Sequence, residues 1–337
     1  MNNRKGPFLI AEAGVNHNGE LELAKRLIDA AAAAGADAVK FQTFRAESLV
    51  TASAPKARYQ KKASGGTQLS MLKGLELSER AHRELFAHSR KRGCLFLSTP
   101  FDEKSADFIE RLKVPIFKIA SGELTNIPFL SHLARKGRPL MLSTGMSTLE
   151  EVSQAVAAIR ESGDPPLTLL HCVSAYPARP EDANLRAMET LSRKFGLPVG
   201  FSDHTPGIEV AIAAAALGAC VIEKHFTLDK NLPGPDHAAS LDPRELAQLV
   251  RAVRSAALAL GDGRKEPRPC EAELRRLARR SLVLSRPAKA GEVLRASTLA
   301  AKRPGTGIPP ARIAEVIGRR LRRDAPADAV LKWSMLQ

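Results

Sequence analysis

Two lysines lie inside short apolar runs of the sequence, where charged side chains are uncommon. Lys40 stands between Val39 and Phe41, and Lys118 likewise has an apolar residue on either side. A buried lysine is rare unless a charge of opposite sign accompanies it. An anionic ligand would supply that charge, and an internal Lys–Glu pair is the alternative.

Hydroxyl groups recur where similar apolar runs end. Thr99, Ser121, Ser143 and Ser202 stand at four such ends. Hydroxyls can donate hydrogen bonds to phosphate oxygens. Together with two ammonium groups they could form a phosphate-binding cradle without a glycine-rich phosphate loop.

Two histidines, His204 and His225, stand at the ends of neighbouring apolar runs. Two imidazoles at one site can hold a divalent ion if water and substrate oxygens complete the coordination. An ion with open positions can polarise a carbonyl group as a Lewis acid. A general acid–base histidine or a purely structural histidine is the alternative.

Four carboxylates accompany these residues, namely Glu12, Glu123, Glu223 and Asp236. They could bind sugar hydroxyls or move protons. Each could equally be the salt-bridge partner of one of the lysines.

The elements that must position these residues repeat one rhythm over the first 260 residues. Short apolar runs alternate with patterns that have apolar residues every three to four positions, which predicts βα units and a parallel sheet. The eight runs are Phe8–Ala13, Ala36–Gln42, Cys94–Thr99, Ile116–Ala120, Pro139–Thr144, Leu167–Val173, Pro198–Asp203 and Cys220–Phe226. Eight units are the number that closes a (β/α)8 TIM barrel. An open doubly wound sheet is disfavoured because no GxGxxG turn follows the first run.

In such a barrel the carboxyl ends of all strands meet at one mouth. We therefore expect the polar residues at the strand ends to form one ring. Side chains alternate between the two faces of a strand. Lys40 and Gln42 then share a face, as do Glu223 and His225, whereas Lys224 points the other way.

Beyond the barrel, assigned to residues 1–262, the sequence changes character. Residues 263–278 are predicted to be a linker, and residues 279–337 a small β-rich module with a strand at Ser281–Leu284. Within the barrel, the long loop from Arg45 to Gly74 is expected to be either a cover over the site or a mobile tether.

The composition excludes several classes of protein. No apolar run reaches the length of a membrane helix, and no signal peptide is apparent, so we expect a cytoplasmic protein without membrane contact. Four widely spaced cysteines without a CxxC pair predict buried free thiols.

The net charge is +15, and residues 264–337 hold 18 Lys and Arg against seven Asp and Glu. With one Trp and two Tyr in the whole chain, stacking platforms for nucleic acid are poorly supplied, so we expect none to bind.

Ten short segments, in this order, resemble the sialic acid synthase family. They are Ala11–Gly19, Val39–Thr43, Ser98–Phe101, Phe117–Glu123, Leu142–Met146, His171–Pro177, Gly200–Thr205, Ile222–Thr227, Gly234–His237 and Lys302–Gly307. The C-terminal module resembles the antifreeze-protein-like (SAF, β-clip) domain that ends these enzymes.

The resemblance implies a metal-dependent transferase that joins phosphoenolpyruvate to the open-chain aldehyde of an N-acyl hexosamine and releases phosphate by C–O cleavage. N-acetylmannosamine, giving N-acetylneuraminate, is the main expectation. A diacetylated 6-deoxymannose, giving N,N'-diacetyllegionaminate, is the alternative. A Schiff-base aldolase of the same fold, with Lys118 or Lys40 as nucleophile, is a remoter one.

The resemblance also implies roles for individual residues. His204 and His225 would bind a divalent ion, most commonly Mn²⁺, with Mg²⁺ or Co²⁺ possible. Arg303 would reach the N-acyl group in the partner subunit's barrel, which requires a domain-swapped homodimer. The expected catalytic residues are Glu12, Glu223 and His225, and the expected substrate-binding residues are Lys40, Gln42, Thr99, Lys118, Ser121, Ser143, Tyr176, Ser202, Asp236 and Arg303.

Overall fold

The structure is a computed structural model that describes residues 6–57, 60 and 66–337 of the chain. The chain divides into two compact units, Met1–Gly261 and Asp262–Gln337. Each unit has its own apolar core.

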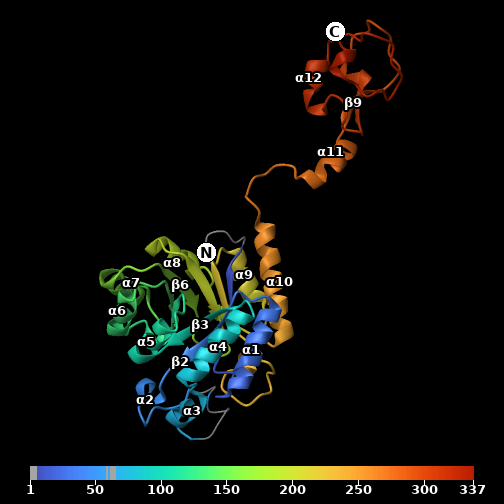
Figure 1. Ribbon diagram of the computed structural model, residues 1–337. Helices are drawn as coiled ribbons and strands as arrows, with labels where there is room; N and C mark the ends of the chain where they lie inside the picture. Colours follow the sequence, from blue (N-terminus) through green and yellow to red (C-terminus); the bar gives the residue numbers. More distant parts are fainter. Residues whose placement is uncertain (1–5, 58–59, 61–65) are drawn as a thin grey trace. The chain divides into compact units, whose positions relative to one another are not determined.

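The first unit is a closed barrel, which confirms the predicted (β/α)8 fold (Figure 1). Among the described residues, eight strands pair in parallel, each with the next along the chain, and β8 pairs with β1. The strands are β1 Phe8–Gly14, β2 Ala38–Thr43, β3 Leu95–Pro100, β4 Phe117–Ile119, β5 Leu140–Ser143, β6 Leu167–Cys172, β7 Val199–Asp203 and β8 Val221–His225. Every predicted run thus overlaps a strand, and β1, β2 and β3 end one residue beyond their runs.

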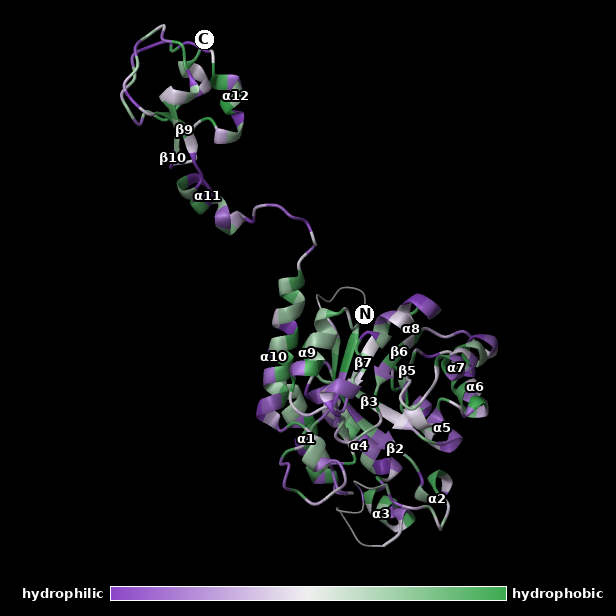
Figure 2. Ribbon diagram, turned by 180° about the vertical axis from the view of Figure 1, so that it is seen from behind, coloured by the Kyte–Doolittle hydropathy of each residue, from purple (hydrophilic) through white to green (hydrophobic). Residues whose placement is uncertain are grey.

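Helices surround the barrel and bury one apolar face against it. They are α1 Leu21–Ala34, α4 Glu79–Lys91, α5 Glu103–Arg111, α6 Ile127–Arg135, α7 Leu149–Ser162, α8 Ala187–Phe195, α9 Glu209–Ala216 and α10 Pro243–Leu260; the shorter helices α2 Ala46–Leu49 and α3 Gln68–Leu75 belong to the loop after β2. Figure 2 shows hydrophobic residues concentrated in the strands and in α9. Because parallel strands are covered on both sides, their sequences read as continuous apolar runs.

Side-chain caps explain where several helices begin. The Ser78 and Asp102 side chains accept hydrogen bonds from backbone N–H groups in the first turns of α4 and α5. Thr148 and Asp242 each form a capping box with a glutamate three residues later, at the starts of α7 and α10. These bonds satisfy N–H groups that have no partner within the helix.

The long loop after β2 contains α2 and α3. Phe44 and Ala46 at its start pack with Leu72, Leu75 and Val15 in a small buried cluster. Both ends of the loop are thereby fixed against the barrel. Residues 58–59 and 61–65 of this loop lie outside the described residues, so its expected role as cover or tether stays a prediction.

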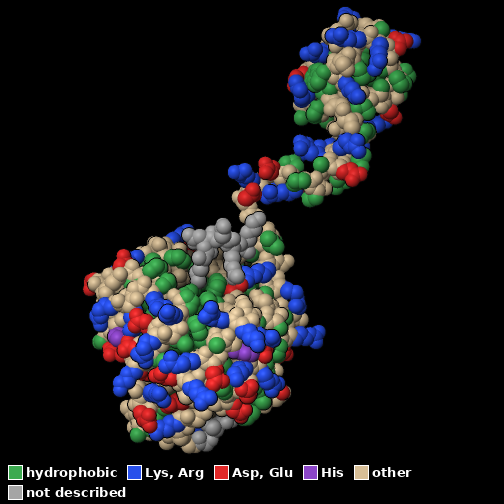
Figure 3. Space-filling model, in the orientation of Figure 1, with side chains coloured by type: hydrophobic (Ala, Val, Ile, Leu, Met, Phe, Trp, Pro, Cys, Tyr) green, Lys and Arg blue, Asp and Glu red, His purple; other side chains and the backbone are tan. Residues whose placement is uncertain are grey.

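The second unit begins with a short helix, α11 Ala272–Ala278, inside the segment that we predicted to be a linker. Strands β9 Ser281–Leu284 and β10 Leu299–Lys302 pair in antiparallel fashion, and a short helix, α12 Ile313–Val316, follows. Leu282, Leu294, Leu321 and Leu331 are among the buried residues of its core. Figure 3 shows many Lys and Arg side chains on the visible surface of this unit.

None of the described helices combines the length and apolarity needed to cross a bilayer. The expected burial of all four cysteines is wrong for Cys270, which is exposed, and Cys220 is partly exposed.

Candidate active site

Neighbouring strands place charged and polar side chains of the barrel interior side by side. Glu12 of β1 is in register with Lys40 of β2, and Ser202 of β7 is in register with Glu223 of β8. All four residues are buried. Lys224 points the other way, as its position in the strand predicts, and pairs with a residue outside this set.

Lys40 is held by two neighbours at the carboxyl ends of their strands. Its ammonium Nζ lies 2.8 Å from Glu12 Oε2 and donates a hydrogen bond of 3.0 Å to Thr99 Oγ1. The Lys40 side chain is only 3% exposed. A lysine so deeply shielded from water requires this pairing to remain charged.

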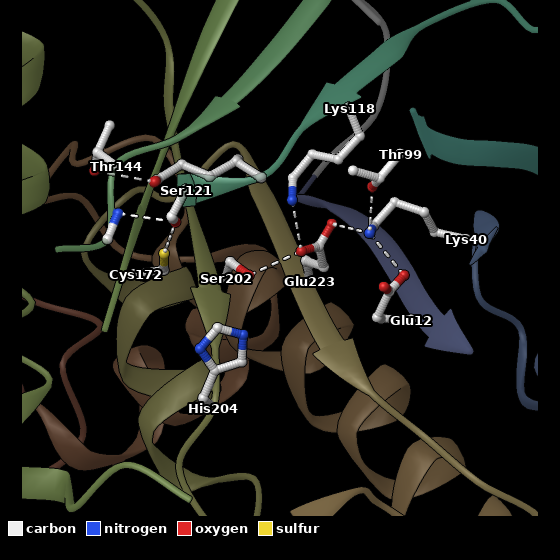
Figure 4. Close-up of polar contacts among 12 residues, drawn as sticks. Glu12, Lys40, Thr99, Lys118, Ser121, Thr144, Cys172, Ser202, His204 and Glu223 are labelled. Carbon is white, nitrogen blue, oxygen red and sulfur yellow. Dashed lines mark hydrogen bonds and ion pairs between the residues drawn. The ribbon is translucent and has the colours of Figure 1, made fainter. Parts of the chain in front are cut away.

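Glu223 joins the second lysine to the first (Figure 4). Lys118 Nζ donates to Glu223 Oε1 at 3.0 Å, and Ser202 Oγ donates to the same oxygen at 2.8 Å. Glu223 Oε2 lies 3.7 Å from Lys40 Nζ. The internal Lys–Glu pairs left open by the sequence therefore do form in this structure. Glu12, Lys40, Glu223 and Lys118 are called the buried tetrad below.

The two carboxylates of the buried tetrad differ in pKa. Burial raises the pKa of Glu12 to about 7, and the positive charge of Lys40 only partly opposes the rise. Burial also acts to raise the pKa of Glu223, but the charges of Lys118 and Lys40 outweigh it and hold that pKa well below its ordinary value. Glu12 can therefore gain or lose a proton near neutral pH, whereas Glu223 stays ionised.

Hydroxyl groups complete this side of the mouth. Ser143 Oγ at the end of β5 is buried and has no hydrogen-bond partner among the described residues. Ser121 Oγ, just after β4, accepts a hydrogen bond of 3.0 Å from the Gly145 backbone N–H. A buried hydroxyl without a partner is costly unless a ligand can use it. Ser143 therefore suits an oxygen-rich ligand next to the lysines.

Next to the buried tetrad three aromatic rings meet, since His225 of β8 is in register with Glu12 of β1. The ring centroids of His204 and His225 are 5.5 Å apart, and the Tyr176 ring lies 4.3 Å from His204 and 5.8 Å from His225. His204 Nδ1 donates to the Val173 carbonyl at 2.7 Å. Because a neutral imidazole carries one N–H, this bond leaves the Nε2 lone pair of His204 free to accept.

The histidine pair fits a divalent ion with open coordination positions. His225 Nδ1 is buried without a hydrogen-bond partner among the described residues. Burial lowers the pKa of both imidazoles, which keeps them neutral, as metal ligands must be. Within the described residues, no group of three or more His, Cys, Asp or Glu could hold a metal ion. An ion here would take two ligands from the protein and the rest from water and substrate.

Asp236 and Gln42 are the expected contacts for the sugar. The Asp236 side chain is buried, and burial raises its pKa to about 6. Gln42 is partly exposed near the end of β2. Ser240 Oγ donates to the Asp236 carbonyl at 2.7 Å, and Asn16 Nδ2 donates to that hydroxyl at 2.9 Å. The loop that carries Asp236 is thereby fixed to the segment after β1.

Two residues of this region were given no role in the sequence analysis. Cys172 Sγ lies 3.1 Å from Ser121 Oγ, and Cys172 is in register with the inward-facing Ser202. Asn16 has a buried Oδ1 without a partner among the described residues. The position of Cys172 in its strand could have predicted its inward direction, but the environment of Asn16 arises from a loop that returns 224 residues later.

Arg303 is exposed in the second unit, next to a cis peptide bond with Pro304. Its expected contact with a partner subunit stays a prediction.

Comparisons with known proteins now bear on this geometry. The NeuB family model matches residues 27–265, and the SAF domain model matches residues 279–337. The chain belongs to the NeuB family. It is 50% identical to the N,N'-diacetyllegionaminic acid synthase of Legionella pneumophila over 98% of this chain and 94% of that protein. It is 46% identical to the corresponding synthase of Campylobacter jejuni over 97% and 99%.

Among solved structures, the chain is similar to the N-acetylneuraminic acid synthetase of Leptospira borgpetersenii in complex with citrate. The TM-score is 0.72 and the sequence identity 39%, over 81% of this chain and 93% of that chain. This NeuB-family chain is a phosphoenolpyruvate-dependent synthase of the sialic acid type, with a barrel followed by a SAF domain.

Proposed function

We propose that this NeuB-family enzyme condenses phosphoenolpyruvate with the open-chain aldehyde of a diacetylated 6-deoxymannose, forming N,N'-diacetyllegionaminate and phosphate. The reaction class rests above all on the buried tetrad beside the His204–His225 pair. The choice of sugar is supported by relatives, since two N,N'-diacetyllegionaminic acid synthases are more similar to this chain than the solved N-acetylneuraminic acid synthetase. N-acetylmannosamine, our main expectation from sequence, becomes the second candidate.

Phosphoenolpyruvate would bind at the buried tetrad. Its carboxylate and phosphate can bind Lys40 and Lys118, while Glu12 and Glu223 remain the neighbours of these lysines. Ser143 Oγ, which lacks a partner among the described residues, can donate to the same oxygens, as can Ser121, Ser202 and Thr99. Shielding from water strengthens these interactions, because the local dielectric constant is low.

The sugar aldehyde would bind on the histidine side. Tyr176, Gln42 and Asp236 are the proposed contacts for its polar groups. A divalent ion held by His204 Nε2 and an imidazole nitrogen of His225 would polarise the aldehyde carbonyl as a Lewis acid. The protein thereby brings a weak carbon nucleophile and its electrophile together in one cavity.

The enol carbon C3 of phosphoenolpyruvate forms a bond to the aldehyde carbon, and C2 becomes an oxocarbenium-like centre. The aldehyde oxygen takes up a proton and becomes a hydroxyl group. Water adds to C2 and releases one proton. Phosphate then leaves by cleavage of the C2–O bond, as the new C2 hydroxyl gives up its proton and becomes the keto oxygen. Glu12, whose pKa is about 7, can accept the proton that water releases, while Glu223 stays anionic beside the developing positive charge.

A Schiff-base mechanism is disfavoured by the state of the lysines. A nucleophilic lysine needs a lowered pKa. Burial alone would lower the pKa of Lys40, but the carboxylates of Glu12 and Glu223 raise it above its ordinary value. Lys118 is likewise paired with Glu223.

The deciding experiment is mass spectrometry of products from phosphoenolpyruvate and a panel of N-acyl hexosamines that includes the diacetylated 6-deoxy sugar. We expect that sugar to give the highest kcat/KM, and a chelator to abolish turnover. Preference for N-acetylmannosamine would overturn the proposed sugar. A covalent adduct trapped by borohydride with pyruvate would overturn the reaction class.

A further inference from the structure

The backbone segments that carry His204 and His225 are linked by side chains on the outer face of the barrel strands. Asp203 precedes His204, Lys224 precedes His225, and Asp203 and Lys224 are in register on β7 and β8. Because side chains alternate along a strand, both point away from the buried tetrad, toward the surrounding helices. Their side chains are 0% and 2% exposed, respectively.

Lys224 contacts the residues on both sides of His204. Its Nζ donates to Asp203 Oδ2 at 2.6 Å and to the Thr205 backbone carbonyl at 2.5 Å. The other oxygen of the same carboxylate, Asp203 Oδ1, accepts hydrogen bonds from the Thr205 backbone N–H at 2.8 Å and from Thr205 Oγ1 at 2.7 Å. Asp203, Thr205 and Lys224 are called the staple below.

The staple fixes the backbone on which the first histidine stands. A carboxylate that accepts from the N–H two residues later closes a tight turn, and His204 is the residue inside that turn. The His204 carbonyl also accepts a hydrogen bond of 2.9 Å from the Ala178 N–H. With Nδ1 bonded to Val173, the imidazole has little freedom to turn.

The staple also connects this turn to the second histidine. Lys224 is covalently joined to His225, so its two bonds to the turn couple the segments that carry the two rings. We propose that Asp203, Thr205 and Lys224 are positioning residues that set the separation of His204 and His225 for a divalent ion. This inference rests on the proposed function, because it takes the histidine pair to be the metal site.

The expected effect is on metal affinity rather than on phosphoenolpyruvate binding. Partners behind the ligands of a metal typically contribute about 10- to 100-fold to its affinity. The phosphoenolpyruvate side of the mouth depends on Lys40 and Lys118, and the staple makes no hydrogen bond to either among the described residues.

The experiment titrates Mn²⁺ into the metal-free full-length chain and measures free Mn²⁺ by electron paramagnetic resonance. Thr205→Val removes the hydroxyl bond to Asp203 at nearly constant volume, and Thr205→Ser retains it. We expect Mn²⁺ binding about 10-fold weaker in Thr205→Val and close to wild type in Thr205→Ser. Phosphoenolpyruvate affinity without metal, measured by calorimetry, should be unchanged in both.

Lys224→Met tests the cross-strand connection, and Lys136→Met is its matched control. Lys136 is also a largely shielded lysine, its side chain 9% exposed, but it stands at the end of helix α6 and pairs with Asp107 and Glu110 of helix α5. We expect Lys224→Met, but not Lys136→Met, to weaken Mn²⁺ binding. If circular dichroism shows that Lys224→Met does not fold, the Thr205 pair decides.

Two results would overturn the inference. One is that Thr205→Val binds Mn²⁺ as tightly as wild type. The other is that the controls, Thr205→Ser and Lys136→Met, lose as much Mn²⁺ affinity as Thr205→Val and Lys224→Met. A failure of the proposed metal site is recognised separately by His225→Ala. If that variant bound Mn²⁺ as tightly as wild type, the metal role of the histidines would be wrong, and the staple would lose its proposed purpose.

Discussion

The barrel mouth and the second unit both carry many charged side chains. Those of the mouth are shielded from water, whereas those of the second unit are exposed to it. In the mouth, the side chains of Lys40 and Lys118 are 3% and 5% exposed, and each is paired with a carboxylate. In the second unit, paired residues such as Lys289 and Asp324 remain 84% and 60% exposed. Charge that is removed from water at such a cost is retained where it does chemistry, whereas surface charge mainly shapes the long-range field.

The histidine side of the mouth gives the largest expected effect. In His225→Ala we expect kcat to fall by about 10³-fold or more, because activation of the aldehyde carbonyl is lost. Steady-state kinetics with saturating Mn²⁺ measures this, and circular dichroism checks the fold. His132→Ala, on helix α6, is the control. An unchanged rate in His225→Ala would show that this histidine is not needed for catalysis, and the mouth could no longer be called the catalytic region on this ground.

Lys118→Met tests whether the buried lysines serve substrate or only stability. We expect kcat/KM for phosphoenolpyruvate to fall by about 10²- to 10³-fold, as when one preorganised donor to a reacting anion is removed. Lys136→Met keeps the chemical change but lies outside the mouth, so it should retain wild-type kinetics. If both variants lost activity equally, the loss would not be specific to the mouth, and Lys118 would have no special role in binding phosphoenolpyruvate.

Strand parity accounts for most of what the sequence predicted about this region. Alternation separated Lys224 from Glu223 and His225, and apolar neighbours on either side indicated buried positions for Lys40 and Lys118. The contacts formed agree with both predictions. It could not say which lysine meets which carboxylate. That depends on register between strands, and the β1–β2 register shifts between Glu12 and Gly14.

Other features depend on contacts that no local pattern reveals. The surroundings of Asn16 and Asp236 are set by loops distant in sequence. Helix α11 was missed for a different reason. The Pro and Gly residues at 261–269 indicated a linker, and the prediction extended that linker to residue 278. It therefore included Ala272–Ala278, which consists of good helix formers.

A buried neutral histidine makes the stability of the barrel depend on pH. Burial lowers the pKa of His17 to about 3, so the unfolded chain binds a proton below pH 6.5 that the folded chain does not. Stability is therefore fully present above pH 6.5 and lost as pH falls, by about 2 kcal/mol between pH 7 and pH 5.

His17→Asn isolates this contribution, because Asn can accept the Gly19 N–H bond that His17 Nδ1 accepts at 3.0 Å. We expect the variant to be less stable at pH 7, yet to show a shallower fall in urea midpoint toward pH 5. His88→Asn, a partly exposed residue of α4, is the comparison. Parallel curves for wild type and His17→Asn would show that burial of this ring does not couple to protons.

Arg303→Ala asks whether any charge of the second unit takes part in the mouth's chemistry. We expect KM for the N-acyl sugar to rise about 10-fold, the value of one hydrogen bond from a charged donor, with KM for phosphoenolpyruvate unchanged. Lys302→Ala changes the neighbouring exposed cation, which pairs with Asp328, and should have no effect. Equal changes in both KM values for Arg303→Ala would argue against a partner-subunit contact with the sugar.

Lys289→Ala should have the smallest effect, because it removes a charge that water already solvates. Lys289 Nζ lies 2.8 Å from Asp324 Oδ2, but the Asp324 carboxylate also accepts a bond of 2.8 Å from the Ala290 N–H. The substitution thus leaves no buried group without a partner, and exposed pairs contribute little. We expect the thermal midpoint of the full chain to stay within measurement error. A clear drop would mean that an exposed pair contributes measurably to the stability of this unit, and exposure alone would no longer separate the two regions.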